Sequence, residues 1–197
     1  MYLNLFSDIT DALVKDGYII IDNALKKQLC NDLLLYAKDE SNYKNAGISA
    51  SSDFHIDTTK RSDKTLWIDE DNASQSEYLT FAKDLQEYLN RELYLGLSYY
   101  EAHFAIYNAG DFYEKHLDAF TGSKNRVVTT VFYLNDEWDE KDGGELVIYD
   151  ESDKLIKKVL PKSNTLVVFL SDKFPHEVLK ANKKRFSIAG WFRVDKS

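Results

Sequence analysis

The second half of the chain is a succession of short runs rich in β-branched and aromatic residues, separated by residues that favour turns. Such side chains suit the pleated, half-buried surface of a sheet, so each run predicts a strand. Turns are indicated by Asn, Asp or Gly within residues 108–111, 142–144 and 181–184. The predicted strands are residues 99–107, 113–118, 127–134, 145–149, 155–160, 165–170, 176–179 and 185–194.

No helical pattern alternates with these strands, which argues against a parallel sheet of strand–helix–strand units. The first half of the chain is helical in pattern instead. Apolar residues recur at every fourth position from Leu25 to Ala37, after Asn23 as the predicted N-cap. We therefore expect a mainly β fold, an antiparallel sandwich or jelly roll, with N-terminal helices packed on one sheet.

A second helix is predicted up to Leu93. Ser74 and Glu77 have the spacing of a capping box, an apolar stripe follows them, and Gly96 suits a left-handed stop. Residues 49–63, between the two helices, are rich in Ser, Asp and Thr and have no periodicity. We predict that they form a long loop that acts as a lid over bound substrate; the alternatives are disorder or a solvated linker.

Composition limits the classes of protein that the chain can belong to. With 197 residues, 44% of them hydrophobic, we expect one domain over residues 1–197, with helical support in about 1–96 and a jelly-roll core in about 97–197. A net charge of −8 argues against a nucleic-acid partner, and no stretch is long and apolar enough to span a membrane. Cys30 is the single cysteine, which predicts a reducing, cytoplasmic location.

Two histidines and one carboxylate can form a metal site. His116 precedes Asp118 by two positions, and alternate residues of an extended chain point to the same side. His176 opens a later predicted strand and is the natural third ligand. This ligand set leaves positions open on non-haem Fe(II) for a chelating co-substrate and O₂. The alternative is a chance His-x-Asp pair beside an ordinary strand histidine.

Arg185 lies nine residues after His176, across the predicted turn at 181–184. A hairpin at this turn would place the arginine beside the metal-binding strand, within the same cavity. A buried guanidinium needs an anionic partner, which a dicarboxylate bound to the metal would supply. The alternative is an exposed arginine that continues the basic pair Lys183 and Lys184.

From about Lys60 to its C-terminus, the chain resembles the 2-oxoglutarate and Fe(II)-dependent oxygenases of the prolyl 4-hydroxylase type. It is most similar to the HIF-prolyl-hydroxylase-like branch and its small bacterial relatives. The segments that carry the resemblance are KRSDKTLWI at 60–68 and the longer matches at 106–120, 125–149, 166–178 and 184–193.

This resemblance implies a double-stranded β-helix with His116, Asp118 and His176 as ligands of Fe(II). It also implies that 2-oxoglutarate and O₂ are co-substrates and that ascorbate supports turnover. The expected activity is hydroxylation of a prolyl residue in a protein, with a translation factor or another cytosolic protein as the substrate.

The resemblance further assigns residues to the co-substrate pocket. Arg185 is expected to pair with the distal carboxylate of 2-oxoglutarate, helped by the Tyr133 hydroxyl. Tyr107 falls at a catalytic position beside the metal-bound co-substrate, although its spacing to the first metal ligand is one residue shorter than in the animal enzymes. Leu146 and Trp191 match positions in the pocket wall.

Three more residues match positions at the substrate side of the site. Asp63 and Arg126 are expected to pair and to anchor the loop before Trp67, with Arg61 beside the substrate channel. Other readings remain open: the same chemistry on another side chain or on a free amino acid, a metal-binding jelly roll or zinc hydrolase without oxygenase activity, and a pure interaction module.

Overall fold

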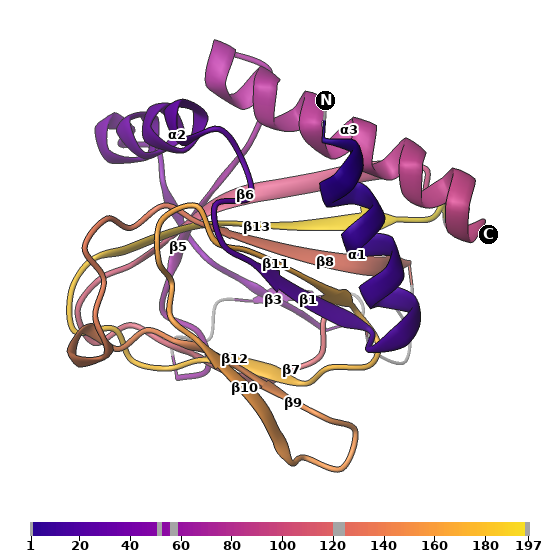
Figure 1. Ribbon diagram of the computed structural model, residues 1–197. Helices are drawn as coiled ribbons and strands as arrows, with labels where there is room; N and C mark the ends of the chain where they lie inside the picture. Colours follow the sequence, from indigo (N-terminus) through magenta and orange to yellow (C-terminus); the bar gives the residue numbers. More distant parts are fainter. Residues whose placement is uncertain (1, 51–52, 56–58, 120–124, 196–197) are drawn as a thin grey trace.

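The computed structural model describes residues 2–50, 53–55, 59–119 and 125–195 of the chain. Two antiparallel sheets lie face to face, with helices on the outer side of the larger one (Figure 1). The larger sheet contains, in spatial order, β1 (Tyr18–Ile21), β11 (Leu166–Leu170), β8 (Arg126–Tyr133), β13 (Arg185–Arg193), β6 (Tyr99–Tyr107), β5 (Lys64–Trp67) and β2 (Lys44–Asn45). The smaller sheet contains β10 (Leu155–Val159), β9 (Leu146–Tyr149), β12 (His176–Val178) and β7 (Tyr113–His116).

The predicted jelly roll with helices on one sheet is therefore confirmed. All eight predicted strands are present, and β6 has the predicted ends. The strand β1 was missed because its sequence, YIII, has no polar alternation and pairs only with the distant β11. It completes one edge of the larger sheet, while β5 and β2 complete the other.

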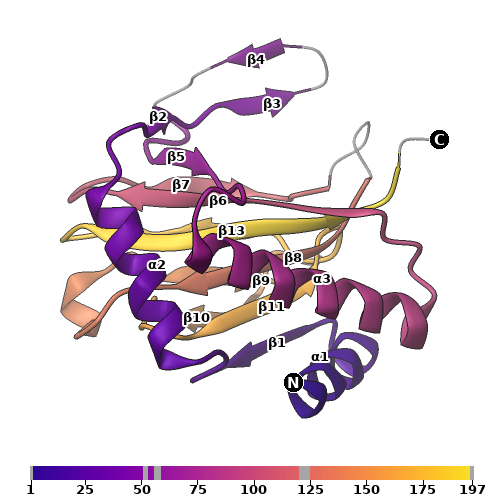
Figure 2. The same ribbon diagram turned by 90° about the horizontal axis from the view of Figure 1, so that it is seen from above.

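In the described part of the chain, α-helices cover the outer face of the larger sheet (Figures 1 and 2). They are α1 (Leu3–Lys15), α2 (Lys27–Asp39) and α3 (Ala73–Leu93), and a short 3₁₀ helix (Glu140–Asp142) lies between β8 and β9. The helices pack on alternate residues of the central strands, such as Phe104, Phe132 and Ile188, to form one apolar core.

The ends of these helices differ from the prediction. The first residue of α2 is Lys27, after Lys26 as N-cap, because Asn23 has a φ of 54° and belongs to the preceding turn. Asn72 caps α3, accepting a hydrogen bond from the Gln75 amide at 3.0 Å, so the predicted capping box at Ser74 is wrong. The left-handed stop falls on Tyr94, two residues earlier than predicted.

A second apolar core fills the space between the two sheets. It includes Ala105 and Val131 from the larger sheet, and Ile148 and Val178 from the smaller one. Each sheet therefore places one row of alternate residues in the interior between them. The side chains that could bind a metal or an anionic ligand lie in this same interior, away from bulk water.

The predicted loop at residues 49–63 contains regular structure. Its described part includes β3 (Ile48–Ala50) and β4 (Asp53–His55), which pair as an antiparallel hairpin beside β2 and β5 (Figure 2). Residues 51–52 and 56–58 of the predicted lid lie outside the described residues. Within the described part of the chain, no helix combines the length and the apolar character that crossing a membrane requires.

Candidate metal and co-substrate site

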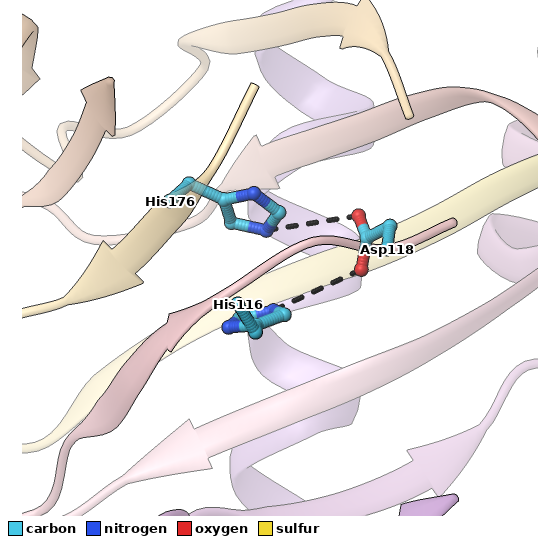
Figure 3. Close-up of side chains that lie close together, drawn as sticks. All are labelled: His116, Asp118 and His176. Carbon is cyan, nitrogen blue, oxygen red and sulfur yellow. Dashed lines mark ion pairs between the residues drawn. The ribbon is translucent and has the colours of Figure 1, made fainter. Parts of the chain in front are cut away.

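Adjacent strands of the smaller sheet bring two histidines together. His116 ends β7 and His176 opens β12, and the two residues are direct partners in the antiparallel ladder. Asp118 follows two residues after His116, and its carboxylate faces both rings (Figure 3). His116 Nε2 lies 3.8 Å from Asp118 Oδ1, and His176 Nε2 lies 3.6 Å from Asp118 Oδ2. The three ligand atoms all lie within 4.8 Å of one another, as ligands of one metal ion require.

Hydrogen bonds orient each of these side chains. His116 Nδ1 donates to the Glu114 carbonyl at 2.8 Å, and His176 Nδ1 donates to the Phe174 carbonyl at 3.0 Å. A carbonyl can only accept, so these bonds fix the tautomer and leave each Nε2 with a lone pair facing Asp118. Outer partners of this kind are typical of metal-binding histidines.

The Asp118 carboxylate is held in a similar way. The Thr129 hydroxyl donates to Asp118 Oδ2 at 2.8 Å and lies 2.8 Å from the Ser171 hydroxyl. Neither Thr129 nor Ser171 was predicted as a site residue. The period of two along a strand could have identified Thr129, because it lies four positions before Tyr133 on the same face of β8.

The electrostatics suit a divalent cation. Burial lowers the pKa of His116 to about 3, with a further contribution from His176, so the imidazole is neutral at neutral pH. Burial alone would raise the pKa of Asp118, but the two histidines, when protonated, and Arg126 lower it. A neutral imidazole and an ionised carboxylate are the protonation states that bind metal.

The larger sheet contributes a buried cation, Arg185, whose side chain is 1% exposed. Its Nε donates to the Gly144 carbonyl at 2.9 Å and its Nη1 to the Ser187 hydroxyl at 3.0 Å. Its Nη2 and the nearby Tyr133 hydroxyl have no hydrogen-bond partner among the described residues. Burying such groups without a partner is costly, so this pair of donors fits an anionic ligand, such as one carboxylate of a dicarboxylate.

Two tyrosines flank this arginine. The guanidinium carbon of Arg185 lies 4.7 Å from the centre of the Tyr107 ring and 5.1 Å from that of Tyr133. Burial raises the pKa of both phenols, that of Tyr133 to about 12. Both hydroxyls therefore stay protonated at neutral pH and can donate a hydrogen bond to a ligand.

The Asp-Gly-Gly turn that the sequence analysis identified gives Arg185 its backbone partner. Gly144 has a φ of +69°, and a Cβ at this position would lie 3.1 Å from Arg185 Cδ. A glycine is suited to this position because the backbone must come close to the arginine side chain in a left-handed conformation.

The predicted hairpin between His176 and Arg185 is wrong. The strand β12 pairs with β7 and β9 in the smaller sheet, whereas β13 pairs with β6 and β8 in the larger one. The turn between them crosses from one sheet to the other. Arg185 therefore enters the interior from the sheet opposite the metal ligands.

The predicted pairing of Asp63 with Arg126 is also wrong. Arg61 donates to Asp63 through Nε at 2.6 Å and Nη2 at 2.9 Å, and Asp63 is 1% exposed. The guanidinium of Arg61 also lies 4.5 Å from the centre of the Tyr113 ring, which stacks on His116 at 3.7 Å. Asp63 does not pair with Arg126 because Arg61, two residues away, forms a bidentate pair with the Asp63 carboxylate.

Both predicted wall residues are buried. Leu146 is 2% exposed and belongs to the core between the sheets. Trp191 is 7% exposed, and the guanidinium carbon of Arg126 lies 3.8 Å from its ring centre.

His103 on β6 makes a pH-dependent contribution to stability. It is 4% exposed, its ring contacts Trp67 and Trp191, and burial, followed by Arg61, lowers its pKa from 6.5 to about 4. The unfolded chain then binds more protons between these values, so the free energy of unfolding falls as the pH drops from 6.5 towards 4.

The variant His103→Met is expected to lose less stability than the wild type when the pH is lowered from 7 to 5. The difference should be about 2 kcal/mol, because the variant has no imidazole to protonate at this position. Urea unfolding at both pH values measures it. An equal loss of stability in the two proteins would contradict the assigned direction.

Comparison with known proteins agrees with this geometry. A family profile described as the 2OG-Fe(II) oxygenase superfamily matches residues 102–193. A prolyl-4-hydroxylase structure from Pseudomonas putida is 33% identical, with 97% of this chain and 100% of that chain covered and a TM-score of 0.87. A Trichoplax adhaerens prolyl hydroxylase in complex with a hypoxia inducible factor peptide fragment is 28% identical, covering 96% and 89% of the two chains, with a TM-score of 0.82.

Among curated proteins, the hypoxia-inducible factor prolyl hydroxylase of Caenorhabditis elegans is 40% identical over 96 residues, 47% of this chain. The matched part is 13% of that protein, and 25% of Egl nine homolog 1 of Rattus norvegicus. A jelly roll with two histidines, an aspartate and a buried arginine in its interior defines a class of non-haem iron oxygenases. The chain belongs to the 2OG-Fe(II) oxygenase superfamily.

Proposed function

We propose that the protein is an Fe(II)- and 2-oxoglutarate-dependent dioxygenase that hydroxylates a prolyl residue in a protein substrate. The observation that carries this proposal is the convergence of two parts in one interior: the His116, Asp118 and His176 cluster and the partnerless donors of Arg185 and Tyr133. When bound, the iron with 2-oxoglutarate and O₂ supplies the oxidation that inserts one oxygen atom into a C–H bond and releases succinate and CO₂.

The metal ligands in this proposal are His116, Asp118 and His176. The backbone carbonyls on the two Nδ1 atoms hold the rings with Nε2 inward, and Thr129 holds the carboxylate. Because the ligand side chains are already ordered, little conformational entropy is lost when a cation binds. The protein residues thus leave the remaining positions of the metal to small ligands.

The co-substrate is bound, in this proposal, by the other sheet. Arg185 donates a charged hydrogen bond to the distal carboxylate, and the protonated Tyr133 hydroxyl donates a second one. The Tyr107 hydroxyl lies at the catalytic position beside the co-substrate. Leu146 and Trp191 form the apolar walls, and they keep water away from the reacting atoms.

For the substrate, we infer a protein segment containing proline, bound where Arg61, Asp63 and Arg126 border the channel. The full-length similarity to a Pseudomonas putida prolyl-4-hydroxylase supports the prolyl target. A cytoplasmic location, which suits the single buried thiol of Cys30, and a translation factor as substrate are the more specific forms of this proposal. We also infer that residues 1–197 act as one domain.

The test is mass spectrometry of lysate proteins incubated with the enzyme, Fe(II), ascorbate and 2-oxoglutarate. We expect one additional oxygen atom on a proline of a defined protein, and no such change when 2-oxoglutarate is omitted. Oxygen added only to another residue type, or turnover only with free amino acids, would replace the prolyl proposal. The absence of any 2-oxoglutarate-dependent product would contradict the oxygenase assignment itself.

A further inference from the structure

Arg126 lies between two carboxylates at the edge of the metal site. Its Nη1 is 3.8 Å from Asp118 Oδ1, and its Nη2 is 3.4 Å from Glu101 Oε1. The flat face of its guanidinium covers the Trp191 ring at 3.8 Å. One permanently charged group is thus shared between a proposed metal ligand and a carboxylate that has no other role in the site.

The position of this cation matters because of the oxygen that it approaches. Asp118 Oδ2 already accepts from Thr129, whereas Oδ1 lies 3.8 Å from His116 Nε2. A separation of 3.8 Å to Arg126 exceeds a direct hydrogen bond, which needs about 2.7–3.2 Å. A small movement would convert it into a buried ion pair that competes with a metal cation for Oδ1.

Glu101 opposes that movement. It is a ladder partner of Trp191 on the neighbouring strand, while Arg193 is a ladder partner of Arg126. These residues therefore lie next to one another on β6, β13 and β8, and Glu101 Oε1 also accepts from Arg193 Nη1 at 2.5 Å. The Glu101 carboxylate is thus shared between two arginines, Arg193 and Arg126, and it attracts Arg126.

We propose that Glu101 is a positioning residue that holds Arg126 off Asp118 Oδ1 and so keeps this oxygen available to the metal. The inference rests on the metal site of the proposed function. Glu101 itself does not touch the metal ligands. Its effect is transmitted through one neighbouring charge, so it should disappear when that charge is removed.

The experiment measures Mn(II) binding to the purified full-length protein without 2-oxoglutarate or substrate, from the electron paramagnetic resonance signal of free Mn(II). The variant Glu101→Gln keeps the shape of the side chain but releases Arg126, and we expect its Kd to rise about tenfold. In Arg126→Gln the competing cation is absent, so its Kd should equal that of the wild type or be lower. The double variant Glu101→Gln with Arg126→Gln should bind Mn(II) as tightly as Arg126→Gln alone.

The variant Arg193→Gln distinguishes a positioning role of Glu101 from a general role in stabilising the fold. It removes the other partner of Glu101, which leaves the full carboxylate charge to Arg126, so its Kd should not rise. If Glu101 merely supports the fold, Glu101→Gln and Arg193→Gln would both weaken binding and Arg126→Gln would not restore it. That pattern would overturn the inference.

Circular dichroism of each variant accompanies the titrations. If Glu101→Gln does not fold, the single variants Arg126→Gln and Arg193→Gln still decide, because weaker Mn(II) binding by either contradicts the proposal. An unchanged Kd in folded Glu101→Gln would also overturn it while leaving the metal site intact. A wild-type protein that binds no Mn(II) would instead remove the metal site of the proposed function, and this inference with it.

Discussion

The variant His176→Ala is expected to lose metal binding and to form no succinate from 2-oxoglutarate. It removes one of the three side chains whose ligand atoms lie within 4.8 Å of one another, and it leaves only His116 and Asp118 of that set. The affinity for Mn(II) should fall by more than about 100-fold, beyond the usual effect of removing only an outer partner of a ligand.

Two measurements check this result: Mn(II) titration and succinate formation in the presence of Fe(II) and ascorbate. The matched control is His103→Met, which removes another buried histidine that is not part of the cluster. This control should bind Mn(II) as the wild type does at pH 7. Full succinate production by His176→Ala would eliminate the assigned ligand set.

The second large effect is expected at Arg185, with metal binding left intact. In Arg185→Gln the affinity for 2-oxoglutarate should fall about 100-fold, which corresponds to about 2.8 kcal/mol, a reasonable value for a buried hydrogen-bonded charge pair. Arg185→Lys keeps the charge but loses the planar fork, so an intermediate loss is expected. The Kd for Mn(II) should stay within about twofold, because the ligands lie on the opposite sheet.

Titration of the Mn(II)-loaded protein with 2-oxoglutarate, followed by isothermal calorimetry, gives this affinity. Lys184→Gln is the control, since it removes an exposed positive charge from the adjacent position of the same turn. It should leave the affinity unchanged. An unaltered affinity in Arg185→Gln would mean that the guanidinium does not contact the co-substrate.

Much of the fold could be predicted because local chemistry determines the strands. The turn residues around β6 and β13 fix where these strands begin and end, and their apolar alternation identifies them. The helix α1 could not be predicted in the same way. The N-cap residue of α1, Tyr2, makes no capping hydrogen bond. The helix packs on α3, which is distant in sequence, and on β1, so tertiary contacts rather than a local pattern stabilise it.

In the candidate site, too, features set by local sequence could be predicted and features set by tertiary contacts could not. The proximity of His116 and Asp118 follows from a spacing of two residues, which the sequence displays directly. The placement of Arg185 depends on which sheet receives the strand after a turn, and turn chemistry does not contain that information. The partner of Asp63 likewise depends on the tertiary arrangement, in which Arg61 donates hydrogen bonds to its carboxylate.

The division of the site between the two sheets has a consequence for co-substrate selection. The three proposed metal ligands belong to β7, β12 and the residues just after β7, whereas Arg185 and Tyr133 belong to β13 and β8. In the proposed binding mode, the span between the metal and the carboxylate anchor is therefore set by the thickness of the apolar core, about 10 Å between packed sheets. In this proposal, core side chains between the sheets, such as Val131 and Ile148, help to determine the carbon chain length of the acid that fits between the two anchors.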